Sequence, residues 1–323
     1  MSLRIGWTRA AEIPGRVAGP QAPAGHVARV TRFGSGLLAA LVLTGCPRSP
    51  PPSQFPTADD ALERMHATYA CSRGIQGEAK IDYFGDAGRV RGNVLYKSML
   101  PDDLRFDVFS PFGMTISTLT SDGETFALYD LREKAFFSGP ANTCNVARFT
   151  RVPVPPHALT QLLRGEAPVL VHSPAQAKIA WESGRYVVRI ASKHQAQQEI
   201  HLEPRDADFL EPWQKQQVRV LEVRVTQQGI DLYRAELDDH KPAPTSKGWE
   251  DPDGLGAGVP PSGPNCSAEV PRRMRLEVPD TDQDLILRVK EATHNPPLLP
   301  NTFRQVPRRG VRVRYSACSD RDL

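Results

Sequence analysis

The sequence predicts a mainly β domain of the α+β class, built on one antiparallel sheet with two helices. Short segments alternate apolar and polar residues, and turn signals separate them about every 8–12 residues. Only two segments beyond residue 46 space their apolar residues as a helix does. The 30 prolines outnumber the 24 glycines, so long uninterrupted helices are not expected. A strand meander of this kind closes into a sandwich or a barrel.

The composition is that of a folded chain with balanced charge. The 323 residues include 40 Lys and Arg against 37 Asp and Glu, for a formal net charge of +3. Apolar residues make up 40% and aromatic residues 7%, which is too many for a disordered chain. A chain of this length buries roughly three quarters of its surface and can hold a sizeable core.

The N-terminal region has the pattern of a secretory signal peptide. Residues 37–45 form a short apolar run that ends in small residues and follows Arg29 and Arg32. The run is shorter than the about 20 residues that span a bilayer. We therefore expect residues 1–45 to be a signal peptide. Signal peptides are usually about 15–30 residues long, so residues 1–26 are expected not to be translated.

The apolar run ends in Leu43-Thr44-Gly45-Cys46, which resembles the bacterial lipobox. The resemblance implies that Cys46 is lipidated and becomes the mature N-terminus. The alternative is a buried apolar strand with a chance cysteine. Pro47 stands where an Asp would resemble an inner-membrane retention signal, which favours the outer membrane. Residues 46–56 are then expected to be an extended, Pro-rich tether that holds the domain off the membrane.

Four cysteines remain after Cys46, an even number that suits disulfides in an oxidising compartment. They are Cys71, Cys144, Cys266 and Cys318. Three pairings are possible. We expect Cys71–Cys144 and Cys266–Cys318, because each pair stays within one half of the chain.

The elements follow in order along residues 57–323, which we expect to form one domain. Residues 57–69 should be helical, with Thr57 as the cap and Asp59 and Asp60 in the first turn. A second helix is expected at residues 155–164, between a proline and Gly165. Residues 241–271 are rich in Pro and Gly and read as a long irregular insert.

Strands are expected wherever the period of the pattern is two. The alternating sets before the second helix are Val90, Val94 and Tyr96; Leu104, Phe106 and Val108; Met114 and Ile116; Phe126 and Leu128. Those after it are Ile179 and Trp181; Tyr186, Val188 and Ile190; Ile200 and Leu202; Leu221, Val223 and Val225; Tyr233, Ala235 and Leu237; Met274, Leu276 and Val278; Leu285, Leu287 and Val289; Val311, Val313 and Tyr315.

Three motifs in this meander resemble the LolA/LolB family of lipoprotein localisation factors. Residues Phe109-Ser110-Pro111-Phe112-Gly113-Met114-Thr115 look like the strand–loop–strand of LolB. Residues 154–165, VPPHALTQLLRG, resemble the central helix motif of the family, and residues 295–311 resemble the C-terminus of LolA. The resemblance implies an unclosed β-barrel, a single curved sheet covered by helices, with a cavity that holds acyl chains of lipoproteins in transit.

The resemblance also implies site residues. The cavity candidates are apolar residues of the sheet and the second helix: Phe106, Val108, Ile116, Leu128, Leu159, Leu162 and Leu163. The loop Pro111-Phe112-Gly113 corresponds to the protruding loop of LolB, which contacts membrane or lipid. Phe112 should be exposed because it stands at a turn, although it could also fold back onto the sheet edge.

The sequence offers no catalytic or metal-binding motif of the well-known types. It contains no HExxH, no GxSxG and no phosphate-binding loop. Asp238-Asp239-His240 imitates a metal site, but polar residues before a Pro-rich loop are usually solvated. We therefore expect no enzyme, cofactor or metal. The expected partners are the membrane, acyl chains and a periplasmic carrier protein. The alternative is a structural or interaction lipoprotein of the same fold with a filled core.

The positive formal net charge of the chain comes from its expected signal peptide. Cleavage before Cys46 would change the formal charge from +3 to −1, so we expect no nucleic-acid partner. The charged residues removed are Arg4, Arg9, Glu12, Arg16, Arg29 and Arg32.

Overall fold

The structure is a computed structural model, and it describes residues 48–85, 88–110, 112–150, 153–254 and 256–316. The expected signal peptide, the expected start near Val27 or Val30, and Cys46 lie outside the described residues. The same holds for Pro111 and Cys318.

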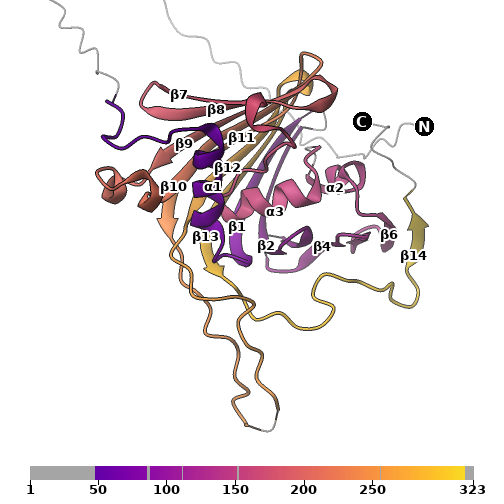
Figure 1. Ribbon diagram of the computed structural model, residues 1–323. Coiled ribbons are helices and arrows are strands. Elements are labelled where there is room, and N and C mark those ends of the chain that lie inside the picture. The colour runs from indigo at the N-terminus through magenta and orange to yellow at the C-terminus, as the bar shows by residue number, and fades with distance from the viewer. Residues whose placement is uncertain (1–47, 86–87, 111, 151–152, 255, 317–323) are drawn as a thin grey trace, which may run out of the picture. The chain divides into compact units, whose positions relative to one another are not determined.

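The described residues form one 14-stranded sheet and three α-helices (Figure 1). The helices are α1 (Ala58–Tyr69), α2 (Thr143–Thr150) and α3 (Pro156–Arg164). The strands are β1 (Gly74–Gly85), β2 (Gly88–Met99), β3 (Asp103–Phe109), β4 (Thr115–Asp122), β5 (Thr125–Asp130), β6 (Ala135–Pro140), β7 (Ala177–Glu182), β8 (Arg185–Ala191), β9 (Ala196–Pro204), β10 (Val218–Gln227), β11 (Ile230–Pro242), β12 (Glu269–Val278), β13 (Gln283–His294) and β14 (Arg312–Tyr315).

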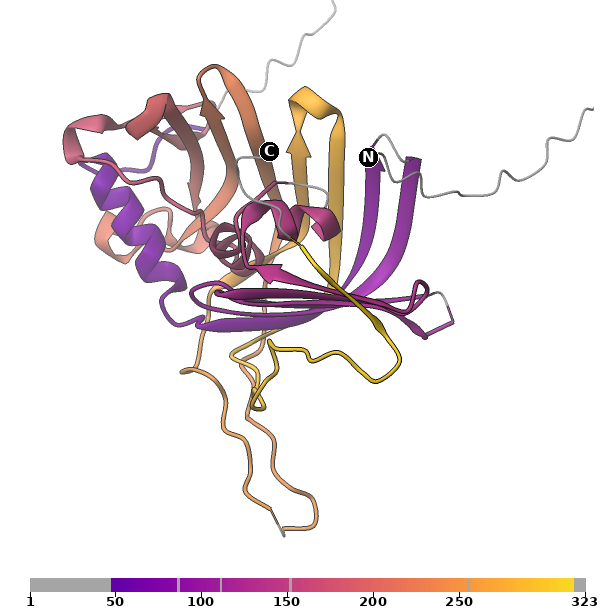
Figure 2. The ribbon, with the colours of Figure 1, turned by 90° about the vertical axis from the view of Figure 1, so that its right-hand side faces the viewer.

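The sheet is curved and open. Its strand order is β14-β6-β5-β4-β3-β2-β1-β13-β12-β11-β10-β9-β8-β7, so β14 and β7 are its two edges. The helices lie on the concave side of the sheet (Figures 1 and 2). This confirms the predicted mainly β fold, a curved sheet that is not closed into a barrel and is covered by helices. One strand pair differs from the prediction, because β14 runs parallel to β6.

The two predicted helices begin and end where their caps require. The Thr57 side chain accepts a hydrogen bond from the Asp60 amide (3.1 Å) at the start of α1. Helix α3 ends at Gly165, whose left-handed φ of 92° suits glycine. Helix α2 was not predicted. Its start is marked by the Asn142 side chain, which accepts from the Asn145 amide (3.0 Å).

The core lies between the concave face and the helices. Side chains of α1 and α3 pack with the inward-facing residues of the strands into one cluster. Its largest members with almost no exposed surface are Tyr69, Tyr96, Tyr186, Phe126, Met65 and Ile75. Burying a side chain of this size stabilises the fold by roughly 1.5–3 kcal/mol.

A C-terminal segment covers part of the outer face. Residues 297–311 run from β13 across the outside of β3–β5 and lead into β14 (Figure 2). The Gln305 side chain donates to the main-chain oxygens of Thr118 (3.0 Å) and Ala127 (3.2 Å). Arg304 forms an ion pair with Asp122 at 2.6 Å. This cover explains why Thr120 is buried on the outer face.

The expected free tether is instead docked on the domain over residues 48–56. The indole of Trp181 donates to the main-chain oxygen of Arg48 at 3.0 Å. Phe55 is buried against the rings of Tyr186 and Trp213. The prediction was wrong for these residues, because a Pro-rich segment with an aromatic side chain can bury that side chain while its backbone remains extended.

The Pro/Gly-rich insert forms an arm, which we define as residues 243–268. It leaves the sheet between β11 and β12 and projects away from the domain (Figure 1). Its outward and return paths meet at a bridge between Trp249 and Val259. The expected irregular segment is therefore shorter than 241–271, because β11 extends to Pro242 and β12 begins at Glu269.

Candidate functional site

The predicted cavity residues of α3 lie in the packed core. Leu159, Leu162 and Leu163 are all buried and belong to the main cluster. Helix α3 sits directly on β1, β2, β3 and β12. The α3 side chains therefore fill the space in which the resemblance places a cavity.

The sheet contributes three of its four predicted cavity residues to the concave side. Phe106 is buried in the core, and Val108 and Leu128 pack against it while partly exposed. Ile116 has no partner on β3, because Val108 pairs with Ser117 and Phe109 pairs with Thr115. It is the extra residue of a bulge, at which strict alternation of the side chains is interrupted. Its place in a cavity stays a prediction.

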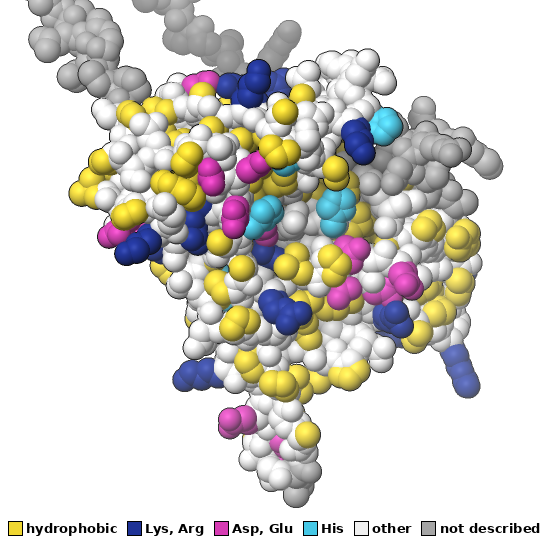
Figure 3. All heavy atoms as spheres, viewed as in Figure 1, with side chains coloured by type: hydrophobic (Ala, Val, Ile, Leu, Met, Phe, Trp, Pro, Cys, Tyr) yellow, Lys and Arg dark blue, Asp and Glu magenta, His cyan; other side chains and the backbone are white. Residues whose placement is uncertain are grey.

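Two surface pockets do not coincide with the predicted cavity. One, of about 470 Å³, lies between the start of α1 and β7 and includes Thr57 and Ile179 in its lining. The other, of about 480 Å³, lies at β7–β10 and includes Arg189 and Arg224. On the side that carries α1 and α3, hydrophobic side chains are interspersed with acidic and histidine side chains (Figure 3). None of the predicted cavity residues lines either pocket.

The β3–β4 turn exposes two large apolar side chains. Phe112 is 88% exposed and Met114 is 67% exposed. The turn is fixed by the Ser110 amide donating to the Met114 oxygen (2.8 Å) and the Met114 amide donating to Ser110 Oγ (3.2 Å). Gly113 has a φ of 79°, which only glycine adopts without strain. Phe112 is thus exposed as expected, and its contact with lipid remains a prediction.

Inward-facing apolar residues lead from this turn toward the core. Pairing between β2 and β3 ends at Asn93↔Phe109, whereas β1 and β2 remain paired as far as Gly85↔Gly88. The β1–β2 and β3–β4 hairpins therefore separate beyond Asn93 (Figure 2). At this point a Cβ on Gly92 would lie 3.7 Å from both Ile81 and Val108. We call the following residues of the two hairpins the apolar fork: Ile81, Val90, Gly92, Val108, Phe112 and Met114.

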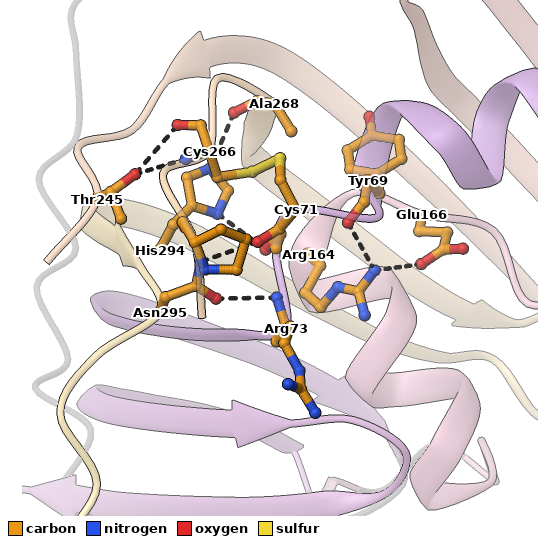
Figure 4. Close-up of a disulfide and its surroundings, with 12 residues drawn as sticks. Tyr69, Cys71, Arg73, Arg164, Glu166, Thr245, Cys266, Ala268, His294 and Asn295 are labelled. Carbon is orange, nitrogen blue, oxygen red and sulfur yellow. Dashed lines mark hydrogen bonds and ion pairs between the residues drawn. A yellow bond between two sulfur atoms is a disulfide. The ribbon is translucent and has the colours of Figure 1, made fainter. Parts of the chain in front are cut away.

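The disulfide pairing differs from the prediction. Cys71 is bonded to Cys266, which joins the end of α1 to the arm across 195 residues (Figure 4). Both predicted pairs, Cys71–Cys144 and Cys266–Cys318, are therefore wrong. Cys144 is also disulfide-bonded. The choice was wrong because the sheet brings β1 beside β13, so the two halves of the chain meet at the base of the arm.

Buried hydrogen bonds surround this disulfide (Figure 4). The Asn295 amide group donates to the main-chain oxygens of Cys71 (2.8 Å) and Pro264 (2.6 Å). His294 Nδ1 lies 2.8 Å from Ser72 Oγ, and its Nε2 lies 2.9 Å from the Ala268 oxygen. Burial lowers the pKa of His294, so the ring is neutral near pH 7. Ser72 and His294 have no exposed surface, and this pair therefore holds the arm rather than meeting a substrate.

A buried ion pair lies beside the disulfide. Arg164 Nη2 is 2.5 Å from Glu166 Oε2 and 3.3 Å from the Tyr69 oxygen. His66 Nδ1 lies 2.6 Å from the other oxygen of Glu166. Nε and Nη1 of Arg164 have no hydrogen-bond partner among the described residues. Burial lowers the pKa of Arg164, and Glu166 counteracts this effect.

The two carboxylates of the sequence that imitates a metal site are engaged in ion pairs. Asp238 forms an ion pair with Arg273, and Asp239 forms one with Lys241. The described residues contain no group of three or more His, Cys, Asp or Glu side chains that could hold a metal ion. None of the helices in the described part of the chain is long and apolar enough to cross a membrane.

Comparison with known proteins shows similarity at the level of the fold. No family model and no curated protein matches the chain. A DUF1329 family protein from Desulfovibrio piger is 11% identical, with a TM-score of 0.48 over 77% of this chain and 96% of that one. A putative outer membrane lipoprotein-sorting protein domain from Vibrio parahaemolyticus is 13% identical (TM-score 0.46, 76% and 97%). A LolA superfamily protein from Nitrosomonas europaea is 10% identical (TM-score 0.47, 77% and 98%).

Proposed function

We propose that the protein is a lipid-anchored envelope protein that binds acyl chains of lipids or lipoproteins at the apolar fork, without enzymatic chemistry. The observation that carries the proposal is the β3–β4 turn, which exposes Phe112 and Met114 to water. Single exposed apolar residues are common on protein surfaces. Here two such residues follow β3 on one turn, and Val108 of that strand is itself partly exposed.

The fork has the chemistry that an alkyl chain requires. Its members are apolar, and a Cβ at Gly92 would meet Ile81 and Val108 in ordinary van der Waals contact, so the surface here is lined by hydrocarbon. Each buried methylene contributes roughly 0.8 kcal/mol, so about six methylenes would supply about 5 kcal/mol without a polar partner. The proposed role therefore needs neither a metal nor a catalytic side chain.

The anchor and the location belong to the same proposal. The lipobox-like motif ends at Cys46, two residues before the docked Arg48. Lipidation there would hold the domain on a membrane of the cell envelope, and the absence of Asp after the cysteine favours the outer membrane on its periplasmic side. A periplasmic carrier would be the source of the acyl chains.

The test measures the uptake of a fluorescent fatty acid by protein whose Cys46 is replaced by Ala. Gly92→Leu places a large side chain against Ile81 and Val108 and should weaken binding several-fold. Its matched control, Gly92→Ala, adds only a Cβ in ordinary van der Waals contact and should bind normally. Equal binding by Gly92→Leu and wild type would place the probe outside the fork.

A second pair of variants tests the exposed turn. Phe112→Glu should weaken uptake, because a carboxylate cannot enter an apolar contact without losing its hydration. Val306 is 82% exposed on the C-terminal segment, so Val306→Glu is the matched control and should have no effect. Unchanged uptake by Phe112→Glu would remove the turn from the site.

One observation favours a second candidate, a structural or interaction lipoprotein. The α3 leucines are buried in the core and fill the place of the cavity. Native mass spectrometry of the purified protein separates the two candidates. Co-purified lipid supports acyl-chain binding, whereas the bare protein mass together with no probe uptake supports the structural role.

A further inference from the structure

The docked N-terminal segment fixes where the chain leaves the domain. Arg48 forms ion pairs with Asp206 (3.0 Å) and Glu203 (3.5 Å), and its guanidinium lies 3.9 Å from the centre of the Phe209 ring. The main-chain oxygen of Arg48 accepts from Trp181 Nε1 at 3.0 Å. Exposed ion pairs contribute little alone, but these four contacts hold both the side chain and the main chain of one residue.

The rest of the segment is held more strongly than Arg48. Phe55 is buried, with its ring centre 4.9 Å from that of Tyr186 and 5.9 Å from that of Trp213. Ser53 accepts from the Trp213 amide with its hydroxyl (3.0 Å) and from Gln216 Nε2 with its main-chain oxygen (3.1 Å). The segment is therefore part of the fold from residue 48 onward and provides little free length.

This docking places the lipidated end of the chain close to one surface. Two residues of extended chain span at most about 7 Å, so Cys46 lies within that distance of Arg48. The residues around Arg48 come from the β7–β8 turn and the β9–β10 connection. We define residues 182–185 and 205–213 as the anchor face. Leu210, near the centre of the longer segment, is 80% exposed.

We propose that the anchor face lies against the lipid bilayer and that Leu210 enters the bilayer interface. The proposal rests on the lipid anchor of the proposed function and adds a fixed orientation to it. A lipid attached within about 7 Å of the docked Arg48 cannot enter a bilayer unless this part of the domain approaches the headgroups. The apolar side chain of Leu210 then gains a lipid environment in place of water.

Charge sets the kind of bilayer contact. The anchor face has four carboxylates, of Glu182, Asp206, Asp208 and Glu211, against the guanidinium groups of Arg185 and Arg205. Basic segments gain about 1 kcal/mol per Lys or Arg near an anionic surface, and this face has no such excess. The contact should therefore form equally well on zwitterionic phosphatidylcholine.

The orientation has a consequence for the apolar fork. In the strand order, seven strands separate β3 from β8, and the β3–β4 turn lies on the side of the molecule opposite to α1 and β7 (Figure 2). Phe112 therefore stands on a turn that is remote from the anchor face. Its lipid contact would be with an acyl chain that arrives from the aqueous side.

The test compares two equally exposed positions in lipidated protein bound to vesicles of brominated phosphatidylcholine, whose bromines quench nearby tryptophans. Trp249→Phe provides the common background. Leu210→Trp and Phe112→Trp each add one indole, at positions 80% and 88% exposed in the wild type. The added emission should be quenched several-fold more strongly at position 210 than at position 112. Equal quenching, or stronger quenching at position 112, would overturn the orientation.

A linker variant tests the cause of this difference. An insertion of about twenty Gly and Ser residues between Pro47 and Arg48 spans about 25 Å and leaves every contact of Arg48–Phe55 in place. Quenching at position 210 should fall to the level of position 112, and unchanged quenching would overturn the proposal. Protein that does not bind vesicles and carries no lipid mass would overturn the anchor and the orientation together, whereas bound protein with equal quenching refutes the orientation alone.

Discussion

Cys71 and Cys266 join the end of α1 to the base of the arm, so that residues 195 apart in the chain become neighbours. The same place holds the buried Ser72–His294 and Asn295 hydrogen bonds. Thr245 adds a further link, because its hydroxyl accepts from the Cys266 amide at 2.8 Å. The arm is thus fixed at its base, although most of its length projects from the sheet.

Loss of this disulfide should destabilise the whole domain. Closing so long a loop is worth about 5 kcal/mol in the chain-entropy model, and native disulfides usually contribute about 2–5 kcal/mol. We expect Cys71→Ala with Cys266→Ala to lower the free energy of unfolding in urea by an amount in this range. An unchanged midpoint would show that the hydrogen bonds around Asn295 hold the arm without the covalent link.

The buried Arg164–Glu166 pair should show strong coupling. Glu166→Gln leaves the Arg164 guanidinium buried without a counter-charge, and breaking a buried pair costs about 3–5 kcal/mol. Arg164→Met should cost a similar amount, because it leaves Glu166 unpaired apart from His66. The double variant Arg164→Met with Glu166→Gln should lose much less than the sum of the two single losses, because no buried charge is left. Additive losses in this double-mutant cycle would contradict the pairing.

Asp82 should stabilise the outer face. Its carboxylate accepts from Arg89 Nε (2.7 Å) and Nη2 (2.5 Å), and these bonds lower its pKa to about 2. Since the folded pKa lies below the ordinary value, the stabilisation is present above about pH 4 and is lost as the pH falls toward 2. Asp82→Asn should cost about 2 kcal/mol near pH 7. Glu78→Gln, on the same strand in an exposed pair with Lys290, should cost under about 1 kcal/mol.

Two histidines should weaken the fold on mild acidification. Burial, followed by the charge of Arg219, lowers the pKa of His240 to about 4, and burial lowers that of His294. Below about pH 6.5 the unfolded chain binds protons that the folded chain does not, so the free energy of unfolding falls from about pH 6.5 toward 4. Urea titrations of His240→Gln should show a shallower fall over this interval.

A carboxylate opposes this effect and provides the control. Burial, with Asp102 and Asp122 nearby, raises the pKa of Asp103 to about 6. Because the folded state binds this proton first, acidification from pH 6 toward 4 stabilises the fold through Asp103. Asp103→Asn should therefore make the loss of stability on acidification steeper than in wild type.

For the histidine prediction, a His240→Gln profile identical to that of wild type would mean that His240 titrates normally.

Local features of the fold could be predicted from the sequence. The capping residue Thr57 and the proline and glycine around α3 mark two helices, and alternation marks most strands, because these signals act within a few residues. Helix α2 was not predicted, because its first turn has no acidic residue and Asn142 was not recognised as its cap. The bulge at Ile116 was also missed, because a strict period of two contains no signal for it.

Long-range features could not be predicted in the same way. The partner of Cys71 depends on β1 lying beside β13, and no local pattern contains that pairing. Family resemblance pointed to the exposed Phe112 turn, but it placed the cavity where Leu159 and Leu162 fill the core. Gly92 belongs to the candidate site because a Cβ there would meet Ile81 and Val108. The signal in the sequence was its place in the alternation Val90, Gly92, Val94.

The last prediction concerns the docked segment, residues 48–56, and it tests whether this segment is fixed on the domain or is a free tether. Phe55 is buried between Tyr186 and Trp213, so Phe55→Ala should cost about 3–5 kcal/mol, as other buried phenylalanines do. It should also release residues 48–56 and make the Arg48–Ser49 bond a rapid trypsin site. Arg48→Gln removes that site and is the control for cleavage elsewhere. A protease binds its substrate in an extended conformation, so docking of residues 48–56 should slow cleavage after Arg48. If trypsin cuts wild type at Arg48 as fast as it cuts Phe55→Ala under native conditions, the segment is a free tether.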